Sequence, residues 1–184
     1  TKLATAIAFS LLAGTTFAAP TFYGEVDVSI DYLPEDNANG NRDVVEVNSN
    51  NSFLGLKGDE KLTDRLSALY QAEFTLYTDD GQGGDGNDTF VPRNLLVGLK
   101  DEKLGAVKLG KIDTPVKQLS ATVDTFNNYV ANKADVNGIF TGENRIDNVL
   151  VYETPAFQVG EGKIEAKLQL ATGEGNETIK ATKG

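Results

Sequence analysis

The sequence predicts an all-β fold: a transmembrane antiparallel β-barrel, of which about seven strands lie in this chain. Apolar and polar residues alternate with period two in several segments, which is typical of two-faced strands. No segment approaches the roughly 20 continuous apolar residues that a spanning helix needs. The connections between the expected strands alternate between short turns and long polar stretches, as in membrane β-barrels.

Residues 1–18 are predicted to be an export signal, and residues 19–184 the barrel segment. Lys2 precedes an apolar run, and the small residues Thr16 and Ala18 favour cleavage after Ala18. The chain begins at Thr1 and contains no Met, so we expect the true N-terminus to lie upstream. The alternative is an ordinary N-terminal core helix.

Residues 22–32 form the clearest two-faced strand. Glu25 and Asp27 belong to its acidic face. The opposite, apolar face carries Phe22, Val26, Val28, Ile30 and Tyr32. Because one side suits an apolar medium and the other suits water, we expect lipid on the first side and a water-filled lumen on the second.

The same alternation recurs along the chain. Residues 65–77 carry apolar side chains at even positions, with Arg65 and Glu73 among the polar ones, and residues 163–172 repeat the pattern. Shorter or less regular strands are expected at residues 44–57, 93–100, 106–111 and 145–153.

The connections differ in length in a regular way. Residues 58–64, 101–105 and 154–162 are short or moderate. Between them lie the longer polar stretches 33–43, 78–89 and 112–144. The last is long for a structureless connector, so we expect it to be functional.

Composition excludes several function classes. Without Cys the chain forms no disulfides, and without His it lacks the commonest general base and transition-metal ligand. A net charge of -10 disfavours nucleic acid as a partner. No nucleophile, phosphate-binding or metal-ligand motif occurs, so we predict no enzyme, no cofactor and no metal site. A secreted β-sandwich or adhesin-like binding module remains the alternative, and a carbohydrate-active enzyme a remote third.

Six strings in order resemble the general diffusion porins of Gram-negative bacteria, in particular the neisserial-type trimeric porins. Phe22-Tyr23-Gly24 looks like their first strand. The second to sixth strands look like residues 52–58, 65–73, 93–100, 104–111 and 144–152.

The resemblance implies a 16-stranded outer-membrane barrel, of which residues 19–184 are the N-terminal half, and a homotrimer at full length. It implies passive diffusion of ions and small hydrophilic solutes, with outer-membrane lipid and lipopolysaccharide as the surroundings. It also implies that the third long connection, residues 112–144, folds inward and narrows the pore. Because about seven strands cannot close such a barrel, we expect the chain to be a fragment.

The resemblance also implies a set of pore-lining residues. Basic residues are expected on the wall at Arg65, Arg93 and Arg145, and acidic residues on the inward connection at Asp124, Asp135 and Glu143. For Arg93 and Arg145 the alternative is a solvated or ion-paired strand residue. A charge facing lipid would cost about 2–4 kcal/mol, which favours the lumen for both.

The wall departs from the family at two positions. Phe53 stands where relatives usually carry an arginine, and Glu25 where some carry a lysine. Both changes remove positive charge from a lumen that Asp27 and Glu73 are also expected to line. The hypothesis is a pore more tolerant of cations than an anion-selective relative.

Overall fold

The computed structural model describes residues 19–33, 44–79, 90–124 and 141–172. Its strands and helix are β1 (Thr21–Glu25), β2 (Val28–Leu33), β3 (Val44–Ser49), β4 (Phe53–Lys61), β5 (Leu66–Leu76), β6 (Phe90–Asp101), β7 (Gly105–Asp113), α2 (Pro115–Ser120), β8 (Arg145–Glu153), β9 (Phe157–Val159), β10 (Gly162–Ile164) and β11 (Lys167–Ala171). The predicted export signal lies outside the described residues.

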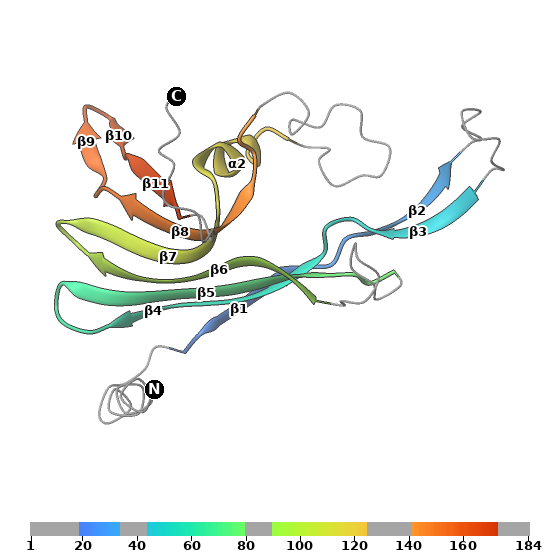
Figure 1. Ribbon diagram of the computed structural model, residues 1–184, viewed down its shortest axis with the longest axis horizontal. Helices are drawn as coiled ribbons and strands as arrows, with labels where there is room; N and C mark the ends of the chain where they lie inside the picture. The colour runs from blue at the N-terminus through green and yellow to red at the C-terminus, as the bar shows by residue number, and fades with distance from the viewer. Residues whose placement is uncertain (1–18, 34–43, 80–89, 125–140, 173–184) are drawn as a thin grey trace.

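Seven of the described strands form one antiparallel sheet in the order β1-β4-β5-β6-β7-β8-β11 (Figure 1). Chain neighbours from β4 to β8 are also sheet neighbours, which is the up-and-down order of a barrel wall. The structure thus confirms the antiparallel β-fold. The described strands form an open sheet, and closure into a barrel is not seen.

Two predicted strands are each divided by a polar joint. The segment 22–32 forms β1 and β2, and the segment 44–57 forms β3 and β4; β2 and β3 pair only with each other. At the joint, Ser52 is fully buried, its hydroxyl donates to the carbonyl of Asp27 (2.9 Å), and the Asp27 N–H donates back to the Ser52 hydroxyl (2.9 Å). Asn51 has a φ of 60°, a left-handed conformation that interrupts regular pairing. Alternation alone gives no signal for such a break.

The short turns share one end of the sheet. Figure 1 shows the β4–β5 and β6–β7 turns beside the β9–β10 hairpin, while β2 and β3 extend from the opposite end. The connection predicted at residues 154–162 differs in detail, because β9 and β10 continue the chain as a second small hairpin between β8 and β11. Of the long stretches, 34–43 and 80–89 lie outside the described residues.

The outer face of the sheet is apolar and exposed. One row of directly opposed residues crosses four strands on the outer face: Val97 (61% exposed), Leu109 (50%), Leu150 and Leu170 (50%). A second outer row follows it: Leu99, Val107, Tyr152 and Leu168, all exposed. The large side chains of the outer face therefore stand uncovered.

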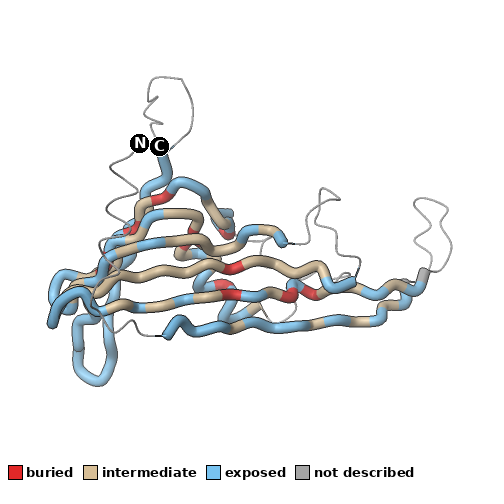
Figure 2. Tube along the Cα trace, turned by 90° about the horizontal axis from the view of Figure 1, so that it is seen from below, coloured by how far each residue is buried: buried red, intermediate tan, exposed pale blue. Residues whose placement is uncertain are grey.

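The inner face carries ion pairs and covered residues, while one further pair, Lys111–Asp147 (2.8 Å), lies on the outer side near the end of β7. Lys108 and Lys167 lie on the inner face and both contact Glu153, at 2.6 and 3.4 Å. Beside them, Val149 and Val151 are buried together with Ile112. Figure 2 shows that buried positions are sparse and that most of the sheet is intermediate or exposed.

Helix α2 interrupts the connection after β7 on the inner side of the curved sheet (Figure 1). Thr114 caps its N-terminus by accepting from the Lys117 N–H (3.2 Å), and Pro115 occupies the first turn, where the lack of an N–H costs nothing. Among the described residues, no helix is long and apolar enough to cross a membrane.

Candidate functional site

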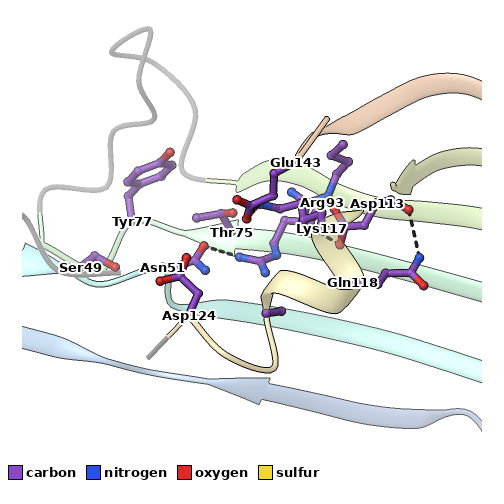
Figure 3. A pocket seen from close by; sticks show the side chains of 12 residues that line it. Ser49, Asn51, Thr75, Tyr77, Arg93, Asp113, Lys117, Gln118, Asp124 and Glu143 are labelled. Carbon is purple, nitrogen blue, oxygen red and sulfur yellow. Dashed lines mark hydrogen bonds and ion pairs between the residues drawn. The ribbon is translucent and has the colours of Figure 1, made fainter. Parts of the chain in front are cut away.

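A polar cavity of about 740 Å³ lies between the inner face of the sheet and the segment that contains α2 (Figure 3). Its lining comes from the ends of β3 and β5, the residues just beyond them and Arg93 of β6 on one side, and from residues 113–124 and 143–145 on the other. The lining residues are Ser49, Asn51, Thr75, Tyr77, Arg93, Asp113, Lys117, Gln118, Ala121, Asp124, Glu143 and Arg145. The connection after β7 thus faces the wall across this cavity.

A β-bulge places Arg93 on the inner face. Ala72 opposes Leu95 and Phe74 opposes Pro92, so that Arg93 and Asn94 together face Glu73. Simple alternation from Leu95 would put Arg93 on the apolar face; the extra residue reverses this. The Arg93 Nε then lies 2.6 Å from Glu73 Oε1, and both side chains are largely covered.

The residues around this ion pair are connected to it by hydrogen bonds and a cation–π contact. The Tyr23 hydroxyl donates to Glu73 Oε2 (2.8 Å), and Gln71 donates to the Tyr23 oxygen (2.8 Å). The Arg93 guanidinium stacks on the Phe53 ring, 4.9 Å from its centroid, and donates through Nη1 to the Asn51 side-chain oxygen. Arg93 is therefore held on three sides.

The facing segment is tied together by two further ion pairs. Arg145 Nε lies 2.9 Å from Asp113 Oδ1, and Asn94 donates to the other Asp113 oxygen (2.8 Å). Lys117 Nζ lies 3.3 Å from Glu143 Oε1. Each basic side chain that lines the cavity thus contacts a carboxylate.

Thr114 connects the two ends of this segment by hydrogen bonds. Its hydroxyl donates to the Gly142 carbonyl (2.6 Å) in addition to capping α2, and the Thr114 N–H donates to the Asn144 carbonyl (2.9 Å). The two ends of the long connection are therefore joined where it leaves and re-enters the sheet.

The structure brings some of the predicted pore residues together. Arg93, Arg145, Asp124 and Glu143 line the cavity, and Glu73 and Phe53 contact Arg93 from behind it.

Other predicted residues lie elsewhere. Arg65 lies in the β4–β5 turn, paired with Asp101 (2.7 Å). Glu25 ends β1 opposite Phe53 on the inner face, and Asp27 belongs to the polar joint. Asp135 lies outside the described residues.

Sequence reasoning missed Asp113, Lys117 and Asn51. Thr114-Pro115 is a capped helix start, and it would have placed Asp113 and Lys117 on either side of a helix N-terminus. Asn51 gave no comparable signal, because its left-handed conformation depends on the joint. No group of three or more acidic residues in the described ranges is arranged to hold a metal ion.

An exposed apolar face backed by a charged inner cavity is typical of membrane pores built from β-sheet. The chain belongs to the Gram-negative porin family, whose pattern matches residues 4–182. Membership of this family confirms the predicted resemblance, and it agrees with the prediction that the chain is not an enzyme.

Individual relatives support the assignment. The chain is 29% identical to an outer membrane porin protein of Bordetella pertussis, over 86% of this chain and 47% of the relative. It is 30% identical to outer membrane porin protein 32 of Delftia acidovorans (82% and 45%) and 27% identical to major outer membrane protein P.IB of Neisseria gonorrhoeae (85% and 47%). The chain spans about half the length of these curated relatives.

Among solved structures, OmpT of Vibrio cholerae, an outer membrane protein in trimer form, matches with a TM-score of 0.49 and 18% identity. The match covers 81% of this chain and 40% of that one. An overlap of this size adds nothing to the family assignment.

Proposed function

We propose that the full-length protein forms a water-filled channel in the outer membrane of a Gram-negative bacterium, through which ions and small hydrophilic solutes diffuse passively. The chain supplies the first half of the wall, which closes as a 16-stranded barrel, and the complete protein assembles as a homotrimer among outer-membrane lipid and lipopolysaccharide. Residues 1–18 are the export signal. No chemical step is involved, since pore shape and lumen charge decide what passes.

The observation that supports this proposal is the exposed apolar outer face of the sheet, opposite a charged inner face. Two rows of mostly exposed apolar side chains cross β6, β7, β8 and β11, whereas the ion pairs Arg93–Glu73 and Lys108–Glu153 stand on the inner face. A water-soluble sheet buries its apolar face, and apolar patches of this extent are rare on soluble monomers. The β-sandwich alternative requires the opposite arrangement, with the apolar rows turned toward a second sheet.

The connection after β7 determines the diameter of the pore. Its described part, with α2 and residues 113–124, lies over the inner face and borders the polar cavity opposite the ends of β3 and β5 and Arg93 of β6. In the complete barrel we expect Arg93 and Arg145 to lie beside Asp124 and Glu143 at the narrowest part of the pore.

The charge pattern favours cations. Arg93, Arg145 and Lys117 each contact a carboxylate, so that none of the three presents an uncompensated positive charge to the lumen. Phe53 and Glu25 add no positive charge. We therefore expect a reversal potential that indicates cation preference.

Conductance tests the function. The full-length protein, refolded in detergent and added to planar bilayers, is expected to give stepwise increases in current in groups of three. A protein that stays monomeric in water without detergent and gives no conductance contradicts the proposal. The selectivity hypothesis is tested separately, by a salt gradient across the same bilayer. A reversal potential that indicates anion preference would overturn it.

A further inference from the structure

We infer that the wall carries a zone of positive charge at the end of the sheet where the β4–β5 and β6–β7 turns lie, and that the pore therefore conducts better in one direction than in the other. This lysine zone consists of inner-face side chains on five strands: Lys57, Lys61, Lys100, Lys108 and Lys167. The inference rests on the proposed pore function and extends it to the direction of ion flow.

The strand register places three of these lysines in one row beside the short turns. The row crosses β4, β5, β6, β7, β8 and β11 through directly opposed residues: Lys61, Ser67, Lys100, Ala106, Glu153 and Lys167. Directly opposed residues of antiparallel strands point to the same side of the sheet. The three lysines therefore share the inner face with Glu153.

The next two inner rows add the remaining lysines. Lys108 of β7 follows Gly98, Leu69 and Asp59 across the sheet, and Lys57 of β4 opposes Gln71 one row further along. Lys57, Asp59 and Lys108 also line a small cavity of about 340 Å³. In these three described rows, five lysines stand against two carboxylates, Asp59 and Glu153.

The two carboxylates leave most of the positive charge uncompensated. Glu153 is shared between Lys108 (2.6 Å) and Lys167 (3.4 Å), so two ammonium groups contact one carboxylate. Lys61 and Lys100 are exposed, and neither forms an ion pair with another described residue. The lysine zone is thus accessible to anions in the lumen.

The polar cavity at the other end has the opposite sign. Its basic residues are outnumbered once Glu73, which contacts Arg93, is included: Arg93, Lys117 and Arg145 stand against Glu73, Asp113, Asp124 and Glu143. Ser67 of the lysine row and Glu73 are six residues apart on β5, which corresponds to about 20 Å along the strand. The wall charge therefore changes sign along the pore.

Fixed charges of opposite sign at the two ends make the current depend on the direction of the voltage. When cations enter from the acidic end and anions from the lysine end, each ion first meets the charge that attracts it, and ions accumulate in the lumen. The reverse voltage depletes the lumen of ions. The screening length is about 10 Å in 0.1 M salt and about 3 Å in 1 M salt, so the two zones act separately in the first and are screened in the second.

Single-channel currents of the full-length protein in planar bilayers of neutral lipid test this inference. The readout is the ratio of the larger to the smaller current at equal voltages of opposite sign, which does not depend on the orientation of insertion. We expect a ratio above one in about 0.1 M potassium chloride and a ratio near one in about 1 M. The double variant Lys61→Gln/Lys100→Gln should lose about half or more of the excess above one.

The controls separate charge, position and folding. Asp59→Asn removes a carboxylate from the lysine zone and should raise the ratio, an effect in the opposite direction. Lys103→Gln changes an exposed lysine of the β6–β7 turn, off the inner face, and should leave the ratio unchanged. Lys61→Arg/Lys100→Arg keeps the charges and should keep the ratio. Should the glutamine double variant fail to form channels, Lys61→Gln and Lys100→Gln are measured singly, and each should lower the ratio in part.

The outcomes are distinct. Wild-type channels that conduct equally in both directions in about 0.1 M salt, or an unchanged ratio in Lys61→Gln/Lys100→Gln, overturn the lysine zone and leave the pore intact. A ratio that falls in Asp59→Asn overturns the sign assigned to this end. A wild type without any conductance overturns the pore function itself.

Discussion

At the scale of single residues, we expect the Arg93–Glu73 pair to determine how much positive charge the wall presents to the pore. The ion pair is short, at 2.6 Å, and its two side chains are 15% and 9% exposed. Tyr23 and Asn51 hold the two partners from either side. Removing one partner of such a pair leaves the other charge buried and uncompensated.

Glu73→Gln is therefore expected to release the Arg93 charge into the lumen. The reversal potential in a salt gradient should move toward the chloride equilibrium potential. Stability in detergent should fall by about 3 kcal/mol, as measured by urea unfolding.

Glu102→Gln is the matched control, since this exposed glutamate lies in the β6–β7 turn away from the cavity. It should change neither quantity. Glu73→Gln channels with wild-type selectivity would mean that Arg93 does not face the conducting path.

At the scale of elements, close backbone approach fixes the pairing of β6 with β7. Gly110 has a φ of +141°, and a Cβ there would lie 2.0 Å from the Leu95 carbonyl oxygen. The neighbouring register shift between β7 and β8 begins at the same glycine. Backbone atoms cannot give way as a flexible side chain does, so the position requires glycine.

Gly110→Ala should therefore destabilise the folded protein by about 2 kcal/mol or more, from strain and from displaced strands. Urea unfolding in detergent measures the loss. Gly160→Ala is the control: Gly160 also has a left-handed φ, +62°, but its added Cβ meets nothing within 4 Å. A cost for Gly160→Ala as large as that for Gly110→Ala would show that backbone conformation alone, and not the close approach, sets the effect.

Thr114 performs a different task for α2, since its hydroxyl both caps the helix and joins it to Gly142. Thr114→Ala should cost about 1 kcal/mol and loosen the inward connection. We expect noisier open-channel current in single-channel recordings, whereas Thr114→Ser should preserve both bonds. Current traces of Thr114→Ala that match those of Thr114→Ser would show that the cap does not hold the connection.

At the scale of the whole molecule, local alternation predicted which strands exist and which face of each is apolar. Phe22, Val97 and Leu168 all lie on the exposed face that period two assigns to them. Alternation failed where the register changes. It could not foresee the joint at Ser52, which depends on a partner 25 residues away, or the bulge at Arg93.

Of the candidate site, the inward direction of its basic residues was predictable from the sequence. The cost of placing charge in lipid pointed Arg93 inward although simple alternation pointed it outward, and the bulge reconciles the two. The pairing of each base with its acid was not predictable, because Glu73 and Arg93 come from different strands and Lys117 and Glu143 from the two ends of one long connection.

The outer face supplies the last prediction, because water and lipid respond to it in opposite ways. Val97 is 61% exposed in the first of the two apolar rows. An arginine at such a site on a water-soluble sheet would change stability by less than about 0.5 kcal/mol. Facing lipid, Val97→Arg should instead cost about 2–4 kcal/mol when the full-length protein is unfolded from lipid vesicles with urea.

Leu119→Arg separates this effect from exposure itself. Leu119 is 71% exposed but belongs to α2 on the inner side of the sheet, so an arginine there should be tolerated. Equal and small costs at both positions would place Val97 in water and remove the physical basis for a membrane wall. A large cost at Val97 alone requires that the exposed apolar rows contact lipid, because no property of the isolated sheet distinguishes the two exposed positions so strongly.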